Sequence, residues 1–517
     1  MKILTAIALM LASAEMGNVA LAQTVTPENT VQSSRAELAS DTIQEIAQAY
    51  HDAGIFDGVI IVATTERVLY SGAFGTANVE FGVRYQQDTR VRLASVSKPF
   101  AAAIVLRLEE DDLLSTSQTV AQVLPELANS PFAGVTIDQL LRHSSGIPNY
   151  QYRAPFQALQ SKVLLSGMGS ITVTLPDMIA TFKDEPLLFE PGTRYDYSNG
   201  NYILIQAIIE QRSGMPFADA LKTFVTGPLG MTDTGALDYR SIRPRLAQGY
   251  FSAPGGFEAP LQAQFVGVPA VGGIYSSTAD MARWFAALFG ERFFKHRETL
   301  EKMTTPRSKA HDAKSFIGYG LFTTMLETGE GSVNLIGHDG WGPPFTANLQ
   351  YSPSNNLIVF AADSIGGLGG ATDGETVRMA ETIFRAANGA AWEKPARPVD
   401  RMLADLINTH GRAEGLARFI KAEPELSGSS SAEREINRLG YAYLGSGKLD
   451  ESVAVFQLNT DLFAQSANAF DSLGEALEAQ GDTAAALTAL LKAQTLQPEN
   501  ARYAETVERL QSEMAQD

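Results

Sequence analysis

The sequence predicts an α+β domain followed by an all-α domain of helical repeats. Three observations support this division. Strand-like runs lie at both ends of a segment of about 300 residues whose middle is helical or loop-like, so a sheet would pair distant segments. A stretch with two prolines, 391–400, then predicts a linker. Beyond it, residue types recur at an offset of 34 residues, which is typical of repeated helical hairpins.

Composition limits the classes of protein to which the chain can belong. Its 517 residues are too many for one ordinary domain, and 45% hydrophobic with 19% charged residues excludes wholesale disorder. Forty basic against 58 acidic residues give a net charge of −18, the wrong sign for a nucleic-acid partner or an anionic membrane. The absence of cysteine excludes disulfides, thiolate zinc sites, a cysteine nucleophile and a lipid-modified cysteine.

Residues 1–22 have the pattern of a signal peptide. A lysine precedes the apolar run Ile3–Ala14, and Ala20-Leu21-Ala22 supplies the small-x-small pattern of a cleavage site before Gln23. The alternative, a short membrane anchor, is disfavoured by the brevity of the run and by Glu15 after it. We expect export to the periplasm or the medium, with no membrane span in the mature protein.

The predicted first domain, 41–390, begins with a helix and a hairpin. Residues 23–40, rich in polar residues, predict a flexible lead-in, and the amphipathic stretch Asp41–Ala53 predicts a helix. Gly58–Ala63 and Val68–Phe74 are apolar runs around a polar tip, which indicates a β-hairpin. Strand character returns in three later runs: Asn334–Ile336, Thr346–Tyr351 and Leu357–Ala362.

The predicted second domain, 401–517, contains two repeats. Leu439-Gly440 recurs as Leu473-Gly474, and Phe456 recurs as Leu490, each 34 residues later. The pattern resembles tetratricopeptide (TPR) units, which stack to bury their apolar faces and whose groove would take a protein or peptide partner. An unrelated helical bundle is the alternative. The predicted parts are a front cap at Arg401–Ile420, repeats at 433–466 and 467–500, and a rear cap at Ala501–Met514.

The chemistry centres on Ser95-Val96-Ser97-Lys98, the only Ser-x-x-Lys in the chain. It opens the apolar run Phe100–Leu108, which predicts a helix, and residues three apart share a helix face. The hydroxyl of Ser95 and the amine of Lys98 can therefore meet. The helix N-terminus would lower the pKa of the lysine and favour developing oxyanion charge. A desolvated lysine can stay neutral and accept the serine proton.

Two companion motifs strengthen this hypothesis. Tyr197 and Asn199 stand in the only Tyr-x-Asn, and His338 and Gly340 in the only His-x-Gly. A phenol near an ammonium can ionise or share a proton, so Tyr197 is a candidate base and later an acid. Asn199 would hydrogen-bond an amide-like part of the substrate, and His338 would donate to a substrate carboxylate or carbonyl. Gly340 would let a strand approach the acyl group closely.

The chain resembles the serine β-lactamase and penicillin-binding-protein superfamily, in the class C-like branch that also holds D,D-peptidases, D-aminopeptidases and esterases. The resemblance runs from about Phe56 to about Ala387. It implies an antiparallel sheet with helices on both faces plus a helical region. Besides the three motifs, the matching blocks are Asp88-Thr89-x-x-Arg92-Leu93-Ala94, Leu140 to Gly146, Pro191-Gly192, Tyr202, Pro228 to Met231 and Gly272 to Ser276.

The resemblance also implies a mechanism. Ser95 would be acylated, Lys98 and Tyr197 would handle its proton, and Asn199 would position the substrate. The oxyanion hole would be the backbone N–H groups of Ser95 and Trp341. No metal or cofactor is expected. The implied activity is that of an exported serine hydrolase for small ester, amide or D-amino-acid peptide substrates.

Two departures from the family pattern leave alternatives open. His338-Asp339-Gly340 stands where efficient class C β-lactamases carry Lys-Thr-Gly, so a permanent cation for the β-lactam carboxylate is missing. Pro343-Pro344-Phe345 stiffens the turn that follows. A β-lactamase that hydrolyses antibiotics is the second hypothesis. A third is a binding protein, either a slowly deacylating sensor of β-lactams or peptides or a TPR scaffold.

Three further positions allow two interpretations each. For His143, a hydrogen-bonded structural histidine is favoured over a catalytic one. Ser277-x-x-Asp280 predicts a helix capping box rather than a site. Asp339, between two candidate functional residues, either selects a cationic substrate or is merely solvated, and the sequence favours neither.

Overall fold

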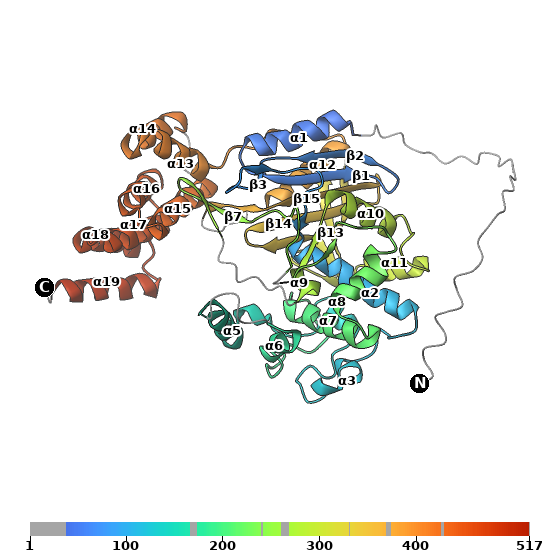
Figure 1. Ribbon diagram of the computed structural model, residues 1–517. Helices are drawn as coiled ribbons and strands as arrows, with labels where there is room; N and C mark the ends of the chain where they lie inside the picture. Colours follow the sequence, from blue (N-terminus) through green and yellow to red (C-terminus); the bar gives the residue numbers. More distant parts are fainter. Residues whose placement is uncertain are drawn as a thin grey trace. The chain divides into compact units, whose positions relative to one another are not determined.

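The computed structural model describes residues 38–165, 173–238, 241–259, 268–329, 331–368, 374–424, 426 and 429–515 (Figure 1). The predicted signal peptide, 1–22, and most of the predicted lead-in, 23–40, lie outside the described residues. None of the helices in the described part of the chain has the length and apolarity needed to span a membrane.

The largest sheet has eight strands in the order β10-β11-β12-β13-β14-β15-β1-β2, and every neighbouring pair is antiparallel. The predicted hairpin is confirmed as β1 and β2. β15 pairs with β1, so Ile60 lies opposite Ala361, which confirms that the sheet joins distant segments. The strands span Gly58–Ala63 (β1), Val68–Ala73 (β2), Ser308–Lys309 (β10), Ser315–Ile317 (β11), Phe322–Thr328 (β12), Gly331–Gly342 (β13), Phe345–Ser352 (β14) and Leu357–Asp363 (β15).

Part of this sheet was not predicted from the sequence. β13 extends far beyond the predicted Asn334–Ile336 at both ends, and β10, β11 and β12 were not expected. β10 and β11 have only two and three residues, too few to create a pattern. β12 contains three threonines and a glutamate, and only its Phe322 and Leu326 are buried, so its apolar signal is weak.

Helices cover both faces of the sheet, as the predicted fold class requires (Figure 1). On one face, α1 (Ser40–Asp52) and α12 (Glu375–Ala387) share a core cluster with β1 and β15. In α1 the buried residues Ile43, Ile46, Ala47 and Tyr50 form one helical stripe. The other face packs against a larger core that includes α2 (Ser97–Glu110), α7 (Asn199–Ser213) and α10 (Thr278–Phe289).

Half of the predicted capping box at Ser277 is present. The Ser277 side chain caps α10 by accepting the backbone N–H of Asp280 at 3.3 Å. The Asp280 carboxylate does not return to the cap. It accepts instead from the backbone N–H of Asp233 at 2.7 Å and from Thr234 at 2.9 Å, so it ties α10 to a neighbouring loop.

Shorter elements complete this part of the chain. The remaining helices and turns are η1 (Ala94–Val96), α3 (Val120–Val123), η2 (Pro125–Leu127), α4 (Ile137–Leu141), η3 (Tyr150–Tyr152), α5 (Ala154–Leu165), α6 (Leu175–Ala180), α8 (Phe217–Leu221), η4 (Lys222–Thr226), α9 (Pro269–Gly272) and α11 (Arg297–Thr304). Three small sheets contain β3 (Thr76–Asn78) and β4 (Val83–Arg84); β5 (Val91–Arg92), β9 (Ile274–Ser276) and β6 (Gly235–Ala236); and β16 (Ile365–Gly366), β7 (Tyr250–Ala253) and β8 (Gly256–Glu258).

The C-terminal part is all helical, in agreement with the predicted fold class. The expected front cap at Arg401–Ile420 consists of two helices, because Gly411 adopts a φ of +79° between them. No helix or strand is assigned at 391–398. The helices are α13 (Val399–His410), α14 (Arg412–Ala422), α15 (Ser430–Gly445), α16 (Leu449–Leu462), α17 (Ala467–Gln480), α18 (Thr483–Leu496) and α19 (Ala501–Met514).

Candidate active site

Ser95 lies on a short 3-10 turn, η1, that leads directly into α2. The sequence expectation placed it in the first turn of the helix itself. Ala94, just before it, has a φ of +45°, a left-handed conformation that costs a residue with a side chain about 1–3 kcal/mol. Ser97 anchors the turn from the other side, because its hydroxyl accepts the backbone N–H of Ile274 at 3.1 Å. The turn therefore holds the Ser95 hydroxyl in a position that the surrounding structure imposes.

Lys98 is fully buried beneath Ser95. Its Nζ lies 2.9 Å from Ser95 Oγ and donates to the backbone carbonyl of Val271 at 2.8 Å. Burial lowers the pKa of Lys98 to about 7, and the Asp339 carboxylate opposes part of this shift. A neutral amine is therefore well populated near neutral pH. It can accept the proton of the Ser95 hydroxyl.

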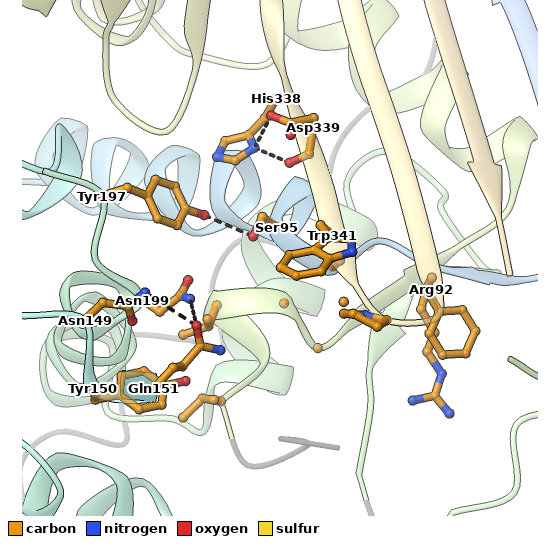
Figure 2. Close-up of a pocket in the computed structure, with 18 of the residues that line it drawn as sticks. Arg92, Ser95, Asn149, Tyr150, Gln151, Tyr197, Asn199, His338, Asp339 and Trp341 are labelled. Carbon is orange, nitrogen blue, oxygen red and sulfur yellow. Dashed lines mark hydrogen bonds and ion pairs between the residues drawn. The ribbon is translucent and has the colours of Figure 1, made fainter. Parts of the chain in front are cut away.

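Tyr197 lies on the other side of the nucleophile, two residues before α7. Its hydroxyl donates to Ser95 Oγ at 3.0 Å (Figure 2). Burial raises the pKa of Tyr197 well above its ordinary value, and the Asp339 carboxylate adds to the rise. Of the two states that the sequence allows, an ionised phenol and a phenol that shares its proton, burial disfavours the ionised one. The phenol stays protonated, so its geometry suits a proton donor and leaves the role of base to Lys98.

His143 supports Tyr197 from beneath. The two rings stack with centroids 4.3 Å apart. His143 Nδ1 accepts the backbone N–H of Ser198 at 3.3 Å and the side-chain amide of Asn201 at 3.0 Å. Burial lowers the pKa of His143 well below its ordinary value, so the ring is neutral. These contacts favour the structural interpretation of this histidine.

His338 and Gly340 face the nucleophile from β13. His338 Nδ1 is hydrogen-bonded to the backbone carbonyl of Asp339, and a carbonyl can only accept, so Nδ1 carries the hydrogen. Burial lowers the pKa of His338 to about 4, which keeps the ring neutral and leaves Nε2 as a lone-pair acceptor. The expectation that His338 donates to the substrate is therefore wrong. A Cβ on Gly340 would lie 2.3 Å from the Leu93 carbonyl oxygen, so only glycine fits there.

These residues border a cavity of about 480 Å³ (Figure 2). Ser95, Tyr197, Asn199, His338 and Trp341 line it directly, whereas Lys98 and Gly340 contact Ser95 from behind. Asn199 Nδ2 donates to Gln151 Oε1 at 3.0 Å, and its Oδ1 has no hydrogen-bond partner among the described residues. The lining residues that were not predicted from the sequence belong to no chemical motif, and they include Asn149, Gln151, His311 and Phe322.

A serine hydroxyl between a buried lysine and a tyrosine, at the floor of a cavity, is the arrangement of a serine hydrolase. The family model described as Beta-lactamase matches residues 39–367, and the chain belongs to this family. Penicillin-binding protein 4* of Bacillus subtilis (strain 168) is 26% identical over 363 residues, which cover 67% of this chain and 75% of that protein.

Two other similarities come from enzymes. Esterase EstB of Burkholderia gladioli is 33% identical over 204 residues, which cover 39% of this chain and 52% of that protein. A solved structure of D-amino acid amidase from Ochrobactrum anthropi SV3, complexed with L-phenylalanine amide, matches with a TM-score of 0.57 at 22% sequence identity. That match covers 68% of this chain and 98% of the amidase, and it is a likeness of fold.

The pKa of Lys98 predicts how the activity depends on pH. If the neutral amine is the base, kcat/KM for an uncharged ester should fall about tenfold per pH unit below the pKa and level off above it. Since burial lowers this pKa to about 7, the bend should lie near pH 7. The measurement is a pH–rate profile, with samples returned to pH 7 to control for inactivation. A profile flat through neutrality would contradict the assignment.

Proposed function

We propose that this chain is an exported serine hydrolase that acts through an acyl-enzyme at Ser95 on small ester, amide or D-amino-acid peptide substrates. The observation that carries the proposal is the convergence on Ser95 Oγ of Lys98 Nζ at 2.9 Å and of the Tyr197 hydroxyl at 3.0 Å. The relatives named as an esterase, a penicillin-binding protein and a D-amino acid amidase support this substrate range.

In the proposed mechanism, Lys98 and Tyr197 each act once in acylation and once in deacylation. Neutral Lys98 takes the Ser95 proton while Oγ attacks the carbonyl carbon, and the backbone N–H groups of Ser95 and Trp341 bind the oxyanion. Tyr197 gives its proton to the departing oxygen or nitrogen, and the proton held by Lys98 restores the phenol. Water then attacks the acyl-enzyme by the reverse sequence. The unpaired Oδ1 of Asn199 is available to accept a substrate N–H.

We expect small esters or D-amino-acid derivatives to turn over well and the cephalosporin nitrocefin slowly. A β-lactam presents a carboxylate, and neutral His338 offers it no charge, because burial lowers the pKa of that ring to about 4. His338→Lys should shift the ratio of nitrocefin to ester kcat/KM about severalfold towards nitrocefin. The ratio is measured on the purified mature protein with p-nitrophenyl esters, D-amino-acid anilides and nitrocefin. Cephalosporin turnover faster than any ester would instead favour a β-lactamase.

We also propose that the exported chain consists of a hydrolase domain at 41–390, a linker at 391–400 and a TPR domain at 401–517. Both ends of α16 and α18 are offset by 34 residues, which supports a repeat. A Cβ on Gly440 would lie 2.4 Å from the ring of Phe456, and one on Gly474 would lie 2.7 Å from Leu490, so the same close contact occurs twice. Such repeats bind a protein or peptide.

A further inference from the structure

One wall of the cavity carries an exposed carboxylate. Asp339 lines the cavity with a side chain that is 61% exposed, and it is the only carboxylate among the described lining residues. Its nearest basic atom is His338 Nδ1, at 3.9 Å from Oδ1. Because the His338 ring is neutral, the negative charge of Asp339 is not compensated there.

Aromatic side chains border the same wall. Trp341 follows Asp339 by two residues on β13, so both side chains leave the strand on the same side, and Trp341 is 57% exposed. Phe322, whose ring centroid lies 5.0 Å from that of His338, also lines the cavity. Aromatic faces attract cations, and aromatic rings around a carboxylate are the usual surroundings of a bound ammonium group.

Among the described residues that line the cavity, Arg92 is the one permanent cation, and it lies elsewhere. Its guanidinium stacks over the ring of Phe345 at 4.7 Å. In Figure 2, Arg92 lies on the far side of Trp341 from Asp339. Arg92 therefore does not neutralise the Asp339 carboxylate, and a positively charged group of a substrate can pair with it.

We propose that Asp339, with the indole of Trp341, forms a subsite for an organic cation such as an ammonium group carried by the substrate. The subsite rests on the proposed hydrolase function and names its substrate class. It favours positively charged esters and amides over neutral ones. It rejects substrates whose carboxylate would face the same wall.

The subsite is coupled to the catalytic base. The Asp339 carboxylate raises the pKa of Lys98 against the effect of burial. The other titratable groups that surround the lysine are neutral: His143, His338, Tyr197 and Tyr202. A cation bound at Asp339 would offset this field and lower the pKa of Lys98. A cationic substrate would thus increase the fraction of neutral amine in its own complex.

The test compares substrates that differ only in charge. On the acyl side the pair is the p-nitrophenyl esters of 4-(trimethylammonio)butanoate and 5,5-dimethylhexanoate, and on the leaving side it is the acetates of choline and 3,3-dimethylbutanol. In at least one pair, kcat/KM should be about tenfold higher for the cation at low salt, and the preference should shrink in about 0.5 M NaCl. Asp339→Asn should remove the preference, whereas Asp184→Asn, which alters a carboxylate outside the cavity lining, should keep it.

The effect of a bound cation on the pKa of Lys98 can be measured separately, from the dependence of kcat on pH. The acid limb of the kcat profile should lie at lower pH for the preferred cation than for its neutral isostere, and Asp339→Asn should make the two limbs coincide. Equal kcat/KM within both pairs, or a cation preference that survives Asp339→Asn, would overturn the subsite. Failure of every ester to turn over or to acylate Ser95 would overturn the proposed hydrolase function instead, so the two failures are distinguishable.

Discussion

Replacing Ser95 with alanine should abolish covalent labelling by a fluorophosphonate and lower ester turnover by about 10⁴-fold or more. The reason is that Lys98 and Tyr197 converge on this one oxygen, and neither can attack a carbonyl from its place. The measurement is intact mass after labelling, followed by peptide mapping, together with turnover of a p-nitrophenyl ester. One added mass per chain is expected in the unaltered protein.

Ser97 provides the matched control, because peptide mapping would find it beside Ser95. It is fully buried, and its hydroxyl accepts the backbone N–H of Ile274. Ser97→Ala should therefore lose about 1–2 kcal/mol of stability and still be labelled. Labelling that persists in Ser95→Ala, or that disappears only in Ser97→Ala, would end the proposed mechanism.

Losing Lys98 or Tyr197 should each lower kcat by on the order of 10²- to 10⁴-fold. Lys98→Met removes the base, and Tyr197→Phe removes only the hydroxyl that donates to Ser95 Oγ at 3.0 Å. Because the two groups move one proton as a unit, the double variant should lose much less than the product of the single losses. The measurement is a double-mutant cycle on kcat for a neutral ester, with folding checked by circular dichroism.

The Lys98→Arg variant tests whether Lys98 acts as a base or only supplies a positive charge. Arginine keeps the positive charge but stays protonated, so a lysine that acts as a base should not be rescued by it. Full rescue by arginine would show that the charge alone matters. Additive losses in the double-mutant cycle would likewise contradict a shared proton path, and they would assign the two side chains to separate steps.

Most of the fold could be predicted because its signals are local. The hairpin of β1 and β2, the strands β14 and β15, and the helix α1 follow from runs of apolar residues with the period of a strand or a helix. β10 and β11 could not be predicted, since strands of two or three residues exist only through their neighbours. The same holds for the left-handed conformation of Ala94, which no local pattern announces.

The chemistry of individual side chains was less predictable than their identity. The sequence picked out Tyr197 and His338, and it suggested a base that later acts as an acid for the first and a hydrogen-bond donor for the second. Burial raises the pKa of Tyr197, which favours the acid role, and it lowers the pKa of His338. The hydrogen on Nδ1 of His338 is held by the backbone carbonyl of Asp339. Protonation depends on solvent access and on neighbours from distant segments, and spacing along the chain reports neither.

The sequence by itself determined which side chains are available: a serine with a lysine three residues on, a tyrosine, an asparagine, and a histidine and glycine far along the chain. Only the tertiary structure decided how they act. It brings Val271 to Lys98 and places the carboxylate of Asp339 in the cavity. The physical reason is that residue spacing sets contacts within one turn or strand, whereas desolvation and electrostatic fields arise from segments that meet only after folding.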